Sequence, residues 1–359
     1  MLIPTIVSGL QGSQMSLSQT ILPSFFITLA SFPFLNVLAR KLGIVDKPGG
    51  RKTHHEATPL TGGIAIGIGM ISMYFFSHDI FMQYWELLFA GALLMIIGFL
   101  DDIYDLSILI RLFFQTMAAL IAIYGGDVRI ETLGDILFLG EINLGILSVP
   151  ITLFAILTGI NALNLCDGVD GLAGGIVLIP LSFLAFLAFH FELRSEFILI
   201  SYLVSTVCGF LMMNFRFPWR KQARVFLGDA GSTVLGFLLA CLLIKASQGS
   251  QAFIEPVSAL WLFAVPLIDT ASVIIKRLIG KRGIFSASRD HLHHLLLTAG
   301  LGVTQAVIAI YAITFMAGFI ATQLVTLHEA ILFICFGILL LLYIAIPPSY
   351  SFFAKNNAL

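Results

Sequence analysis

Long apolar runs separated by short polar stretches dominate the pattern of this chain. A helix needs about 20 apolar residues to cross the hydrocarbon core of a bilayer, and on this basis the pattern predicts eleven transmembrane helices. The predicted spans lie near residues 21–39, 62–77, 83–100, 107–125, 148–163, 172–190, 196–214, 226–244, 256–275, 303–323 and 329–347. The predicted fold is therefore an all-α polytopic membrane protein that forms a single membrane-embedded domain over residues 1–359.

The composition supports this assignment. Of the 359 residues, 58% are hydrophobic and 11% are charged, whereas soluble proteins average about 25% charged residues. The four cysteines are widely spaced and match neither a zinc site nor a disulfide framework. The first 20 residues contain no Lys or Arg, which argues against a signal peptide and favours a short external tail.

The positions of the basic residues predict the orientation of the chain. Sixteen of the 19 Lys and Arg residues fall in the odd-numbered loops and the C-terminal tail. By the positive-inside rule, these segments are cytoplasmic and the N-terminus is external. On the outer side, residues 126–147 alternate in the manner of a small β-hairpin. The polar loops that share the cytoplasmic face are residues 40–61, 101–111, 161–175, 215–232 and 276–300.

The most unusual polar stretch is N-A-L-N-L-C-D-G-V-D-G-L-A-G-G at residues 161–175, between two apolar runs. A carboxylate at the bilayer centre costs roughly 2.5–3.5 kcal/mol on insertion scales, so this stretch belongs at the membrane surface or in a wet cleft. Asn164, Asp167 and Asp170 recur at a spacing of three and lie within reach of one another in a helix or tight turn. Clustered oxygen ligands without His suit a hard cation such as Mg²⁺.

Three further acidic positions stand out. Asp101 and Asp102 lie at the C-terminal end of a predicted helix, where two carboxylates oppose the macrodipole and require a compensating cation or a function. Asp229 lies between glycines at the start of another helix, a place suited to phosphate or a metal. Asp269 is an intramembrane acid, for which function and simple packing are both open explanations.

Two cation-rich loops complete the polar set. The first reads V-D-K-P-G-G-R-K-T-H-H at residues 45–55, for which an ordinary positive-inside loop is an open alternative. The Gly62-Gly63 pair that follows allows a close backbone approach to an anionic group. The second reads F-S-A-S-R-D-H-L-H-H at residues 285–294, and because it lacks the H-E-x-x-H zinc pattern, it favours phosphate binding.

Together these motifs resemble those of the polyprenyl-phosphate N-acetylhexosamine-1-phosphate transferases, in the same order and over nearly the whole chain. The H-x-H-H form is similar to the WecA branch. The resemblance implies transfer of N-acetylglucosamine-1-phosphate from UDP-N-acetylglucosamine to undecaprenyl phosphate, with release of UMP, in the inner membrane of a bacterial cell. This reaction starts a surface polysaccharide. Another UDP-N-acetylhexosamine or a muramoyl-pentapeptide donor remains an alternative.

The resemblance also implies roles for individual residues. Asn164 and Asp229 correspond to ligands of Mg²⁺, for which Mn²⁺ can substitute, and Asp101 and Asp102 to a catalytic acid pair. Asp167 and Asp170 join the catalytic set. The implied substrate-binding residues are Lys47, Arg51, His54, Arg111, Asn161, Asp170, Arg289, His291, His293 and His294.

The chemistry of the acceptor fits a site at the membrane face. A phosphomonoester with a second pKa near ~6 is mostly a dianion at neutral pH, so we expect it to attack the donor directly, with a covalent aspartyl-phosphate route as the alternative. A transporter would need midplane ionisable groups in several helices and repeated halves, and the sequence shows Asp269 and no convincing repeat. No nucleic-acid partner is expected, and a homodimer is compatible with the sequence.

Overall fold

The computed structural model describes residues 17–46, 57–281, 283, 290–323 and 327–346. Every predicted span coincides with a helix or a pair of helices. The elements are α2 (Leu17–Leu42), β1 (Val45–Asp46), β2 (Thr58–Pro59), α3 (Gly62–Ile71), α4 (Met73–Phe76), α5 (His78–Gln83), α6 (Trp85–Tyr104), α7 (Ile108–Tyr124), η1 (Gly145–Leu147), α8 (Ser148–Cys166), α9 (Leu172–His190), α10 (Arg194–Asn214), α11 (Gly228–Ser247), α12 (Pro256–Leu262), α13 (Ala264–Ile279), α14 (Leu292–Thr298), α15 (Val303–Gln323) and α16 (Glu329–Ala345).

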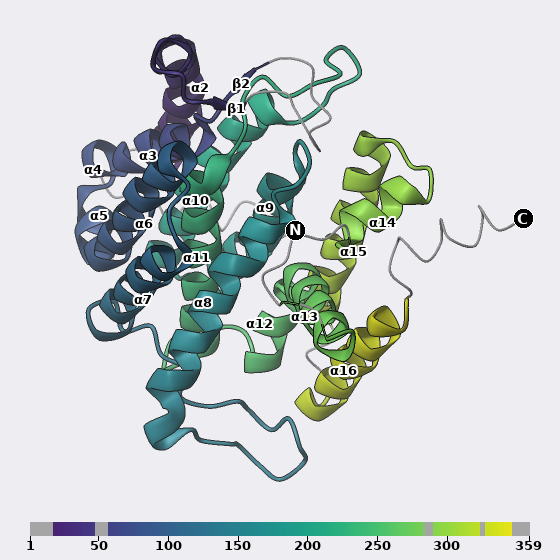
Figure 1. Cartoon of the computed structure of the whole chain (residues 1–359). Coiled ribbons are helices and arrows are strands. Elements are labelled where there is room, and N and C mark those ends of the chain that lie inside the picture. Colours follow the sequence, from purple (N-terminus) through teal and green to yellow (C-terminus); the bar gives the residue numbers. More distant parts are fainter. Residues whose placement is uncertain (1–16, 47–56, 282, 284–289, 324–326, 347–359) are drawn as a thin grey trace, which may run out of the picture.

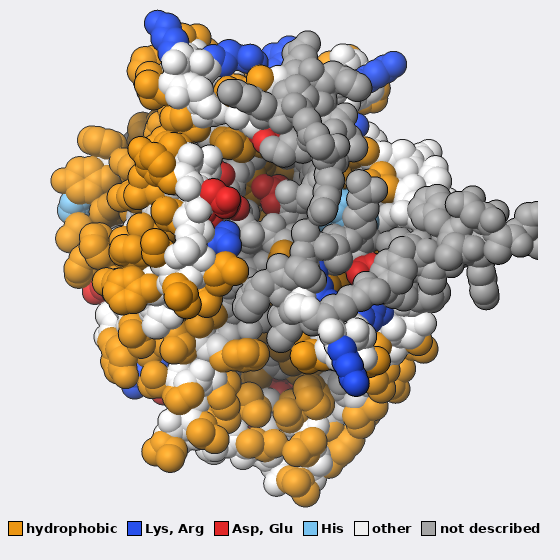
Figure 2. Space-filling view, viewed as in Figure 1, with side chains coloured by type: hydrophobic (Ala, Val, Ile, Leu, Met, Phe, Trp, Pro, Cys, Tyr) orange, Lys and Arg blue, Asp and Glu red, His pale blue; other side chains and the backbone are white. Residues whose placement is uncertain are grey.

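Seven of the described helices are long and apolar enough to cross a membrane. They are α2, α6, α8, α9, α10, α11 and α15. Shorter apolar helical stretches lie at Gly62–Phe76, Ile108–Tyr124 and Glu329–Ala345. Large hydrophobic side chains are exposed along many of these helices, among them Phe26, Phe34 and Phe113. Figure 2 shows such side chains over the left side and the lower part of the face, as expected for a surface in contact with lipid.

The predicted span at 256–275 is not one continuous helix. It is divided into α12 and α13, which meet at Phe263 with a bend of 78°. Pro266 lies in the first turn of α13, where a missing backbone N–H is tolerated, but the same residue cannot donate the hydrogen bond that would continue α12. Counted as one broken span, the pair raises the number of candidate spans to eight.

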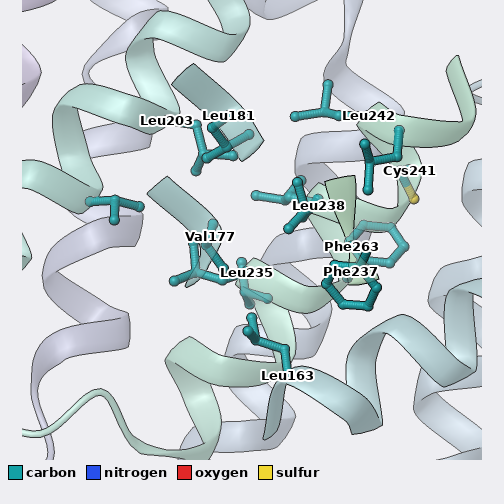
Figure 3. Close-up of a cluster of buried hydrophobic side chains, with 14 of the residues drawn as sticks. Leu163, Val177, Leu181, Leu203, Leu235, Phe237, Leu238, Cys241, Leu242 and Phe263 are labelled. Atoms are coloured by element: carbon teal, nitrogen blue, oxygen red, sulfur yellow. The ribbon is translucent and has the colours of Figure 1, made fainter. Parts of the chain in front are cut away.

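Helix α11 forms the centre of the bundle, and nearly all of its residues are buried. It packs against α6, α8, α3, α12 and α9. Glycines allow the backbones to approach closely, as is typical of helices packed in membranes: a Cβ at Gly98 in α6 would lie 2.6 Å from the Cα of Ala230. Figure 3 shows part of this core, with Leu163 next to Leu235 and Leu203 next to Leu181.

The two ends of the bundle carry different loops (Figure 1). At one end, β1 pairs with β2 in an antiparallel register of Val45 with Pro59 and Asp46 with Thr58. The segment at 126–147, predicted as a hairpin, lies at the opposite end. Its pairing is limited to one isolated bridge, between Thr132 and Asn143, and a few backbone hydrogen bonds. The regular two-stranded sheet among the described residues is therefore the β1–β2 pair.

Candidate active site

Three helix ends bring the central acidic residues together. Asp101 and Asp102 lie in the last turn of α6, Asn164 in the last turn of α8, and Asp229 in the first turn of α11. The close packing of α11 on α6 and α8 places these ends side by side. Figure 2 shows acidic side chains gathered in the upper half of the molecule, beside residues outside the described set.

Asp102 binds the first turn of α11. Its Oδ1 accepts a hydrogen bond from the backbone N–H of Asp229 at 2.9 Å, and its Oδ2 accepts one from Ala230 at 3.3 Å. A carboxylate at a helix N-terminus pairs free N–H groups and offsets the helix dipole. Gly228 precedes this turn with φ +73°, a conformation that favours glycine, and a Cβ there would lie 2.6 Å from Asp102. The G-D-A-G-S motif therefore donates two backbone N–H groups to Asp102 and leaves no room for a side chain at Gly228.

Asp101 forms an ion pair with Arg111, which begins the second turn of the next helix, α7. Its Oδ2 lies 3.0 Å from Nη1 of Arg111, and its Oδ1 accepts a hydrogen bond from the backbone N–H of Leu106 at 2.7 Å. The side chain of Asp101 is only 3% exposed, whereas that of Arg111 is 35% exposed. Arg111 therefore compensates the buried carboxylate and still reaches solvent.

Asn164 and Asp229, the predicted metal pair, are in direct contact across α8 and α11. The Asn164 Nδ2 donates to Oδ1 of Asp229 at 2.6 Å and to Oγ of Ser232 at 2.9 Å. Asp229 also interacts with Asp101. Within the described residues, no three His, Cys, Asp or Glu side chains form a group that could hold a metal ion.

Asp167 follows α8 and adds a further acid to this cluster. Burial, and then the charges of Asp229, Asp102 and Asp170, raise the pKa of Asp167 to about 8. Asp167 is therefore mostly protonated at pH 7, because burial and the neighbouring carboxylates oppose its ionisation. This donor set, made only of carboxylate and amide oxygens, suits a hard divalent cation.

Asp170 and Asn161 flank the cluster and are engaged by the protein itself. Oδ2 of Asp170 accepts from Nε of Arg216 at 2.7 Å and from the backbone N–H of Ala223 at 3.0 Å. Asn161 donates to Oε1 of Gln115 at 3.0 Å. Asp170 therefore holds the 215–227 loop against the turn between α8 and α9.

The His motif lies beside the 161–175 loop. A Cβ at Gly168 would lie 2.9 Å from Cε1 of His293, and the rings of His291 and His293 are stacked, with centroids 5.9 Å apart and planes at 5°. Burial, and then the neighbouring His294, lower the pKa of His293 to about 3, so this ring is neutral at pH 7. The ring of His294 lies 4.2 Å from that of His293.

Four predicted substrate-binding residues, Lys47, Arg51, His54 and Arg289, lie outside the described residues. The Gly62-Gly63 pair, predicted to approach an anion, approaches protein backbone instead. Its amides donate to the carbonyls of Phe226 and Leu227 at 2.9 and 3.0 Å, and a Cβ at Gly63 would lie 2.7 Å from the carbonyl carbon of Ala230. The pair therefore fixes the start of α3 against the start of α11.

The sequence analysis missed polar residues that support the site. Buried Asn214 accepts from the backbone N–H of Gly171 at 2.7 Å and donates to the carbonyl of Val225 at 2.9 Å. Tyr311 of α15 donates to the carbonyl of Gly171. Asn214 could have been found from the sequence, because it is a polar residue at the end of an apolar run. Tyr311 could not, because it lies within an ordinary apolar run.

Comparison with known proteins places this arrangement in a family. Residues 84–247 match the profile of glycosyl transferase family 4. The chain is 33% identical over 324 residues to the undecaprenyl-phosphate alpha-N-acetylglucosaminyl 1-phosphate transferase of Yersinia pestis, covering 89% of this chain and 88% of that protein. The chain belongs to glycosyl transferase family 4.

Other relatives of this family 4 member agree. The protein of the same name from Escherichia coli strain K12 is 34% identical over 297 residues, covering 82% of this chain and 80% of that protein. The one from Haemophilus influenzae is 33% identical over 331 residues, covering 89% of this chain and 92% of that protein. The family resemblance predicted from the motifs is thereby confirmed. The family 4 match includes the acid cluster of α6, α8 and α11, and the His motif lies beyond it.

Proposed function

We propose that this family 4 member transfers N-acetylglucosamine-1-phosphate from UDP-N-acetylglucosamine to undecaprenyl phosphate and releases UMP. The observation that carries this function is the convergence of Asp101, Asp102, Asn164 and Asp229 at one end of membrane-length helices. A lipid phosphate requires a site at the membrane face, and a nucleotide diphosphate donor requires oxygen ligands for a divalent cation. The names of the three relatives agree with this reaction.

Mg²⁺ fits the donor set, with Mn²⁺ as a substitute. Asn164 and Asp229 would hold it and leave the other coordination positions to water and to the phosphates of the donor, as is usual for Mg²⁺. When bound, the cation neutralises charge on the diphosphate. The burial and crowding of carboxylates that raise the pKa of Asp167 support this assignment, because a bound cation would relieve their repulsion.

The protein side chains orient the reactants. An oxygen of the lipid phosphate attacks the sugar-bound phosphorus of the donor, and UMP leaves. The acceptor is already mostly a dianion above its second pKa near ~6, so Asp101 and Asp102 mainly orient the attack, and one of the pair removes the remaining proton at lower pH. Arg111 and the His motif bind the phosphates, and because His293 is neutral at pH 7, it binds by hydrogen bonding rather than by charge.

The topology that goes with this function has eleven spans and an external N-terminus in the inner membrane of a bacterial cell. The three shorter apolar stretches and the bent pair α12–α13 would then also cross the bilayer. The distribution of 16 of the 19 basic residues supports a cytoplasmic active site, where a nucleotide sugar is available.

The test is a coupled measurement of both products. Purified protein is incubated with Mg²⁺, labelled UDP-N-acetylglucosamine and undecaprenyl phosphate in detergent, and UMP and lipid-linked sugar are expected in equal amounts. Removal of the cation with EDTA or omission of the lipid should stop both. UMP release without lipid would identify a hydrolase instead. Turnover only with UDP-N-acetylmuramoyl-pentapeptide would overturn the assigned donor.

A further inference from the structure

Asp269 lies in α13 and joins three separate elements. Its side chain is 3% exposed. Oδ2 lies 2.8 Å from Nδ1 of His291, while Oδ1 accepts from the backbone N–H of Leu292 at 2.8 Å and from Oη of Tyr343 in α16 at 2.7 Å. A buried carboxylate is costly unless its oxygens are fully hydrogen-bonded, and here all three contacts point to the start of α14 or to α16.

The pairing determines which ring nitrogen of His291 carries a proton. A carboxylate only accepts hydrogen bonds, so Nδ1 of His291 is the donor and Nε2 is the nitrogen left for another partner. Carboxylates that hold a His in this way fix its tautomer and its orientation, in serine hydrolases as well as in metal sites.

The orientation of His291 extends to the rest of the His motif. Its ring is parallel to that of His293, which lies against Gly168 in the 161–175 loop. Asp269 also constrains the backbone of this motif, because its bond to Leu292 fixes the residue between the two rings. α13 carries Asp269 to this position because the chain bends by 78° between α12 and α13.

We propose that Asp269 is a positioning residue of the transferase: it holds His291 so that Nε2 faces the phosphates of the donor. The inference rests on the proposed function for the identity of that ligand. Tyr343 in turn orients Asp269. Among the described residues, the other titratable groups near Asp269 and its partners include Cys166 at the end of α8, Lys276 in α13, Asp290, His293 and His294.

A double-mutant cycle tests whether Asp269 acts through His291. Asp269→Asn preserves the shape and an acceptor but cannot accept a hydrogen bond on both oxygens, so kcat should fall about 10–100-fold, the usual loss for such a supporting partner. KM for the donor should change less than about threefold, because the contact of His291 with the phosphates stabilises the transition state, where charge develops, more than the bound donor. In a His291→Ala background, Asp269→Asn should cost nothing further.

The outcomes separate the possible explanations. If the kcat of the double variant fell by the product of the two single losses while the wild type was active, the two residues would act independently. That result would overturn the inference and leave the proposed function intact. A matched rise in KM and fall in folded yield, also seen in Tyr343→Phe, would show a purely structural role. Asp269→Glu keeps the charge and should retain more activity than Asp269→Asn.

A measurement without turnover keeps the inference independent of the proposed reaction. The ¹⁵N NMR signals of His291 in the wild-type protein, assigned by their loss in His291→Ala, should report a protonated Nδ1. A neutral ring protonated on Nε2 alone would overturn the inference even if the wild-type protein turned over no UDP-sugar.

Discussion

Asn164 and Asp229 come from helices that are far apart in the sequence, and their side chains meet at 2.6 Å. The contact depends on glycines that let α8 and α11 touch: a Cβ at Gly236 would lie 2.8 Å from the carbonyl oxygen of Gly159. The close packing of α8 and α11 thus brings the two side chains together. Their roles can be tested by substituting one side chain at a time.

Asn164→Ala and Asp229→Ala should each lower Mg²⁺-dependent turnover more than about 10²-fold, because a lost ligand should cost more than a lost partner of a ligand. Turnover is measured as UMP release. Folding is checked by size-exclusion chromatography in detergent, where a folded variant elutes as a single symmetric peak. Asp127→Asn is the matched control, since this exposed residue lies at the other end of the bundle and its φ of 52° tolerates Asn. Full activity in Asp229→Ala would remove it from the metal site.

Asp101→Asn and Asp102→Asn should each lower kcat by about 10²–10⁴-fold, the usual range for a positioned proton-transfer group. For Asp101 the loss should shrink as the pH rises above ~6, because the lipid phosphate then needs no base. For Asp102 a part of the loss should persist at every pH, since Asn cannot accept both α11 amides. Without acceptor, no stoichiometric burst of UMP is expected. A burst that one of these variants abolishes would establish that aspartate as a covalent nucleophile.

Asp167 predicts how stability depends on pH. Its folded-state pKa of about 8 lies above the value of about 3.9 for an unfolded Asp, so between these values the folded protein keeps a proton that the unfolded chain has lost. Stability then falls as the pH rises through this window. In Mg²⁺-free detergent, the unfolding temperature should drop by a few degrees from about pH 5 to about pH 8. The drop should be smaller in Asp167→Asn, and an unchanged slope would contradict this assignment.

At the scale of elements, glycine positions determine how the helices join. Gly63 begins α3 against the backbone of Ala230 and Gly231 in α11, so a side chain there has no room. Gly337 in α16 has no atom within 4 Å of its Cβ position. The same substitution should therefore have opposite effects at the two sites.

Gly63→Ala should cost about 1–3 kcal/mol, the typical cost of overpacking, and should reduce activity because α3 and α11 separate beside Asp229. Gly337→Ala should be neutral or stabilise by up to about 1 kcal/mol, the helix-propensity difference. Thermal unfolding and UMP release of the two variants are compared. Equal unfolding temperatures would show that α3 can move away from α11 without cost.

Apolar runs were sufficient to predict the helices, because burial in lipid imposes a length and a composition that a single segment displays. Local clusters likewise identified Asp101, Asp102, Asn164 and Asp229 as candidates, and the structure brings these four residues together, while their roles remain predictions. Contacts between distant segments left no such pattern: Tyr343 occurs in an ordinary apolar run, and nothing in the sequence pairs it with Asp269. The bend at Phe263 was missed for a related reason, since its two arms together have the length and hydropathy of one span.

For the whole molecule, the proposed orientation has a direct test. Single cysteines are placed at Leu139, 82% exposed in the 126–147 segment, and at Trp219, 79% exposed in the 215–227 loop, in a chain without its four native cysteines. In intact cells, an impermeant maleimide should label position 139 and spare position 219. Permeabilised cells should label both. Labelling at 219 in intact cells would reverse the topology and place the active site outside.

The enclosure of α11 has a consequence for how the chain is made. Residues of this helix leave the ribosome after α3, α6, α8 and α9 but before α12, and in the finished protein all five surround it. Until α12 arrives, the side of α11 that it covers faces either lipid or the insertion machinery, whereas Asp229 and Ser232 already have partners on the earlier helices α6 and α8. The earlier helices therefore leave one side of the α11 position open, and α11 packs against them from that side before α12 covers it.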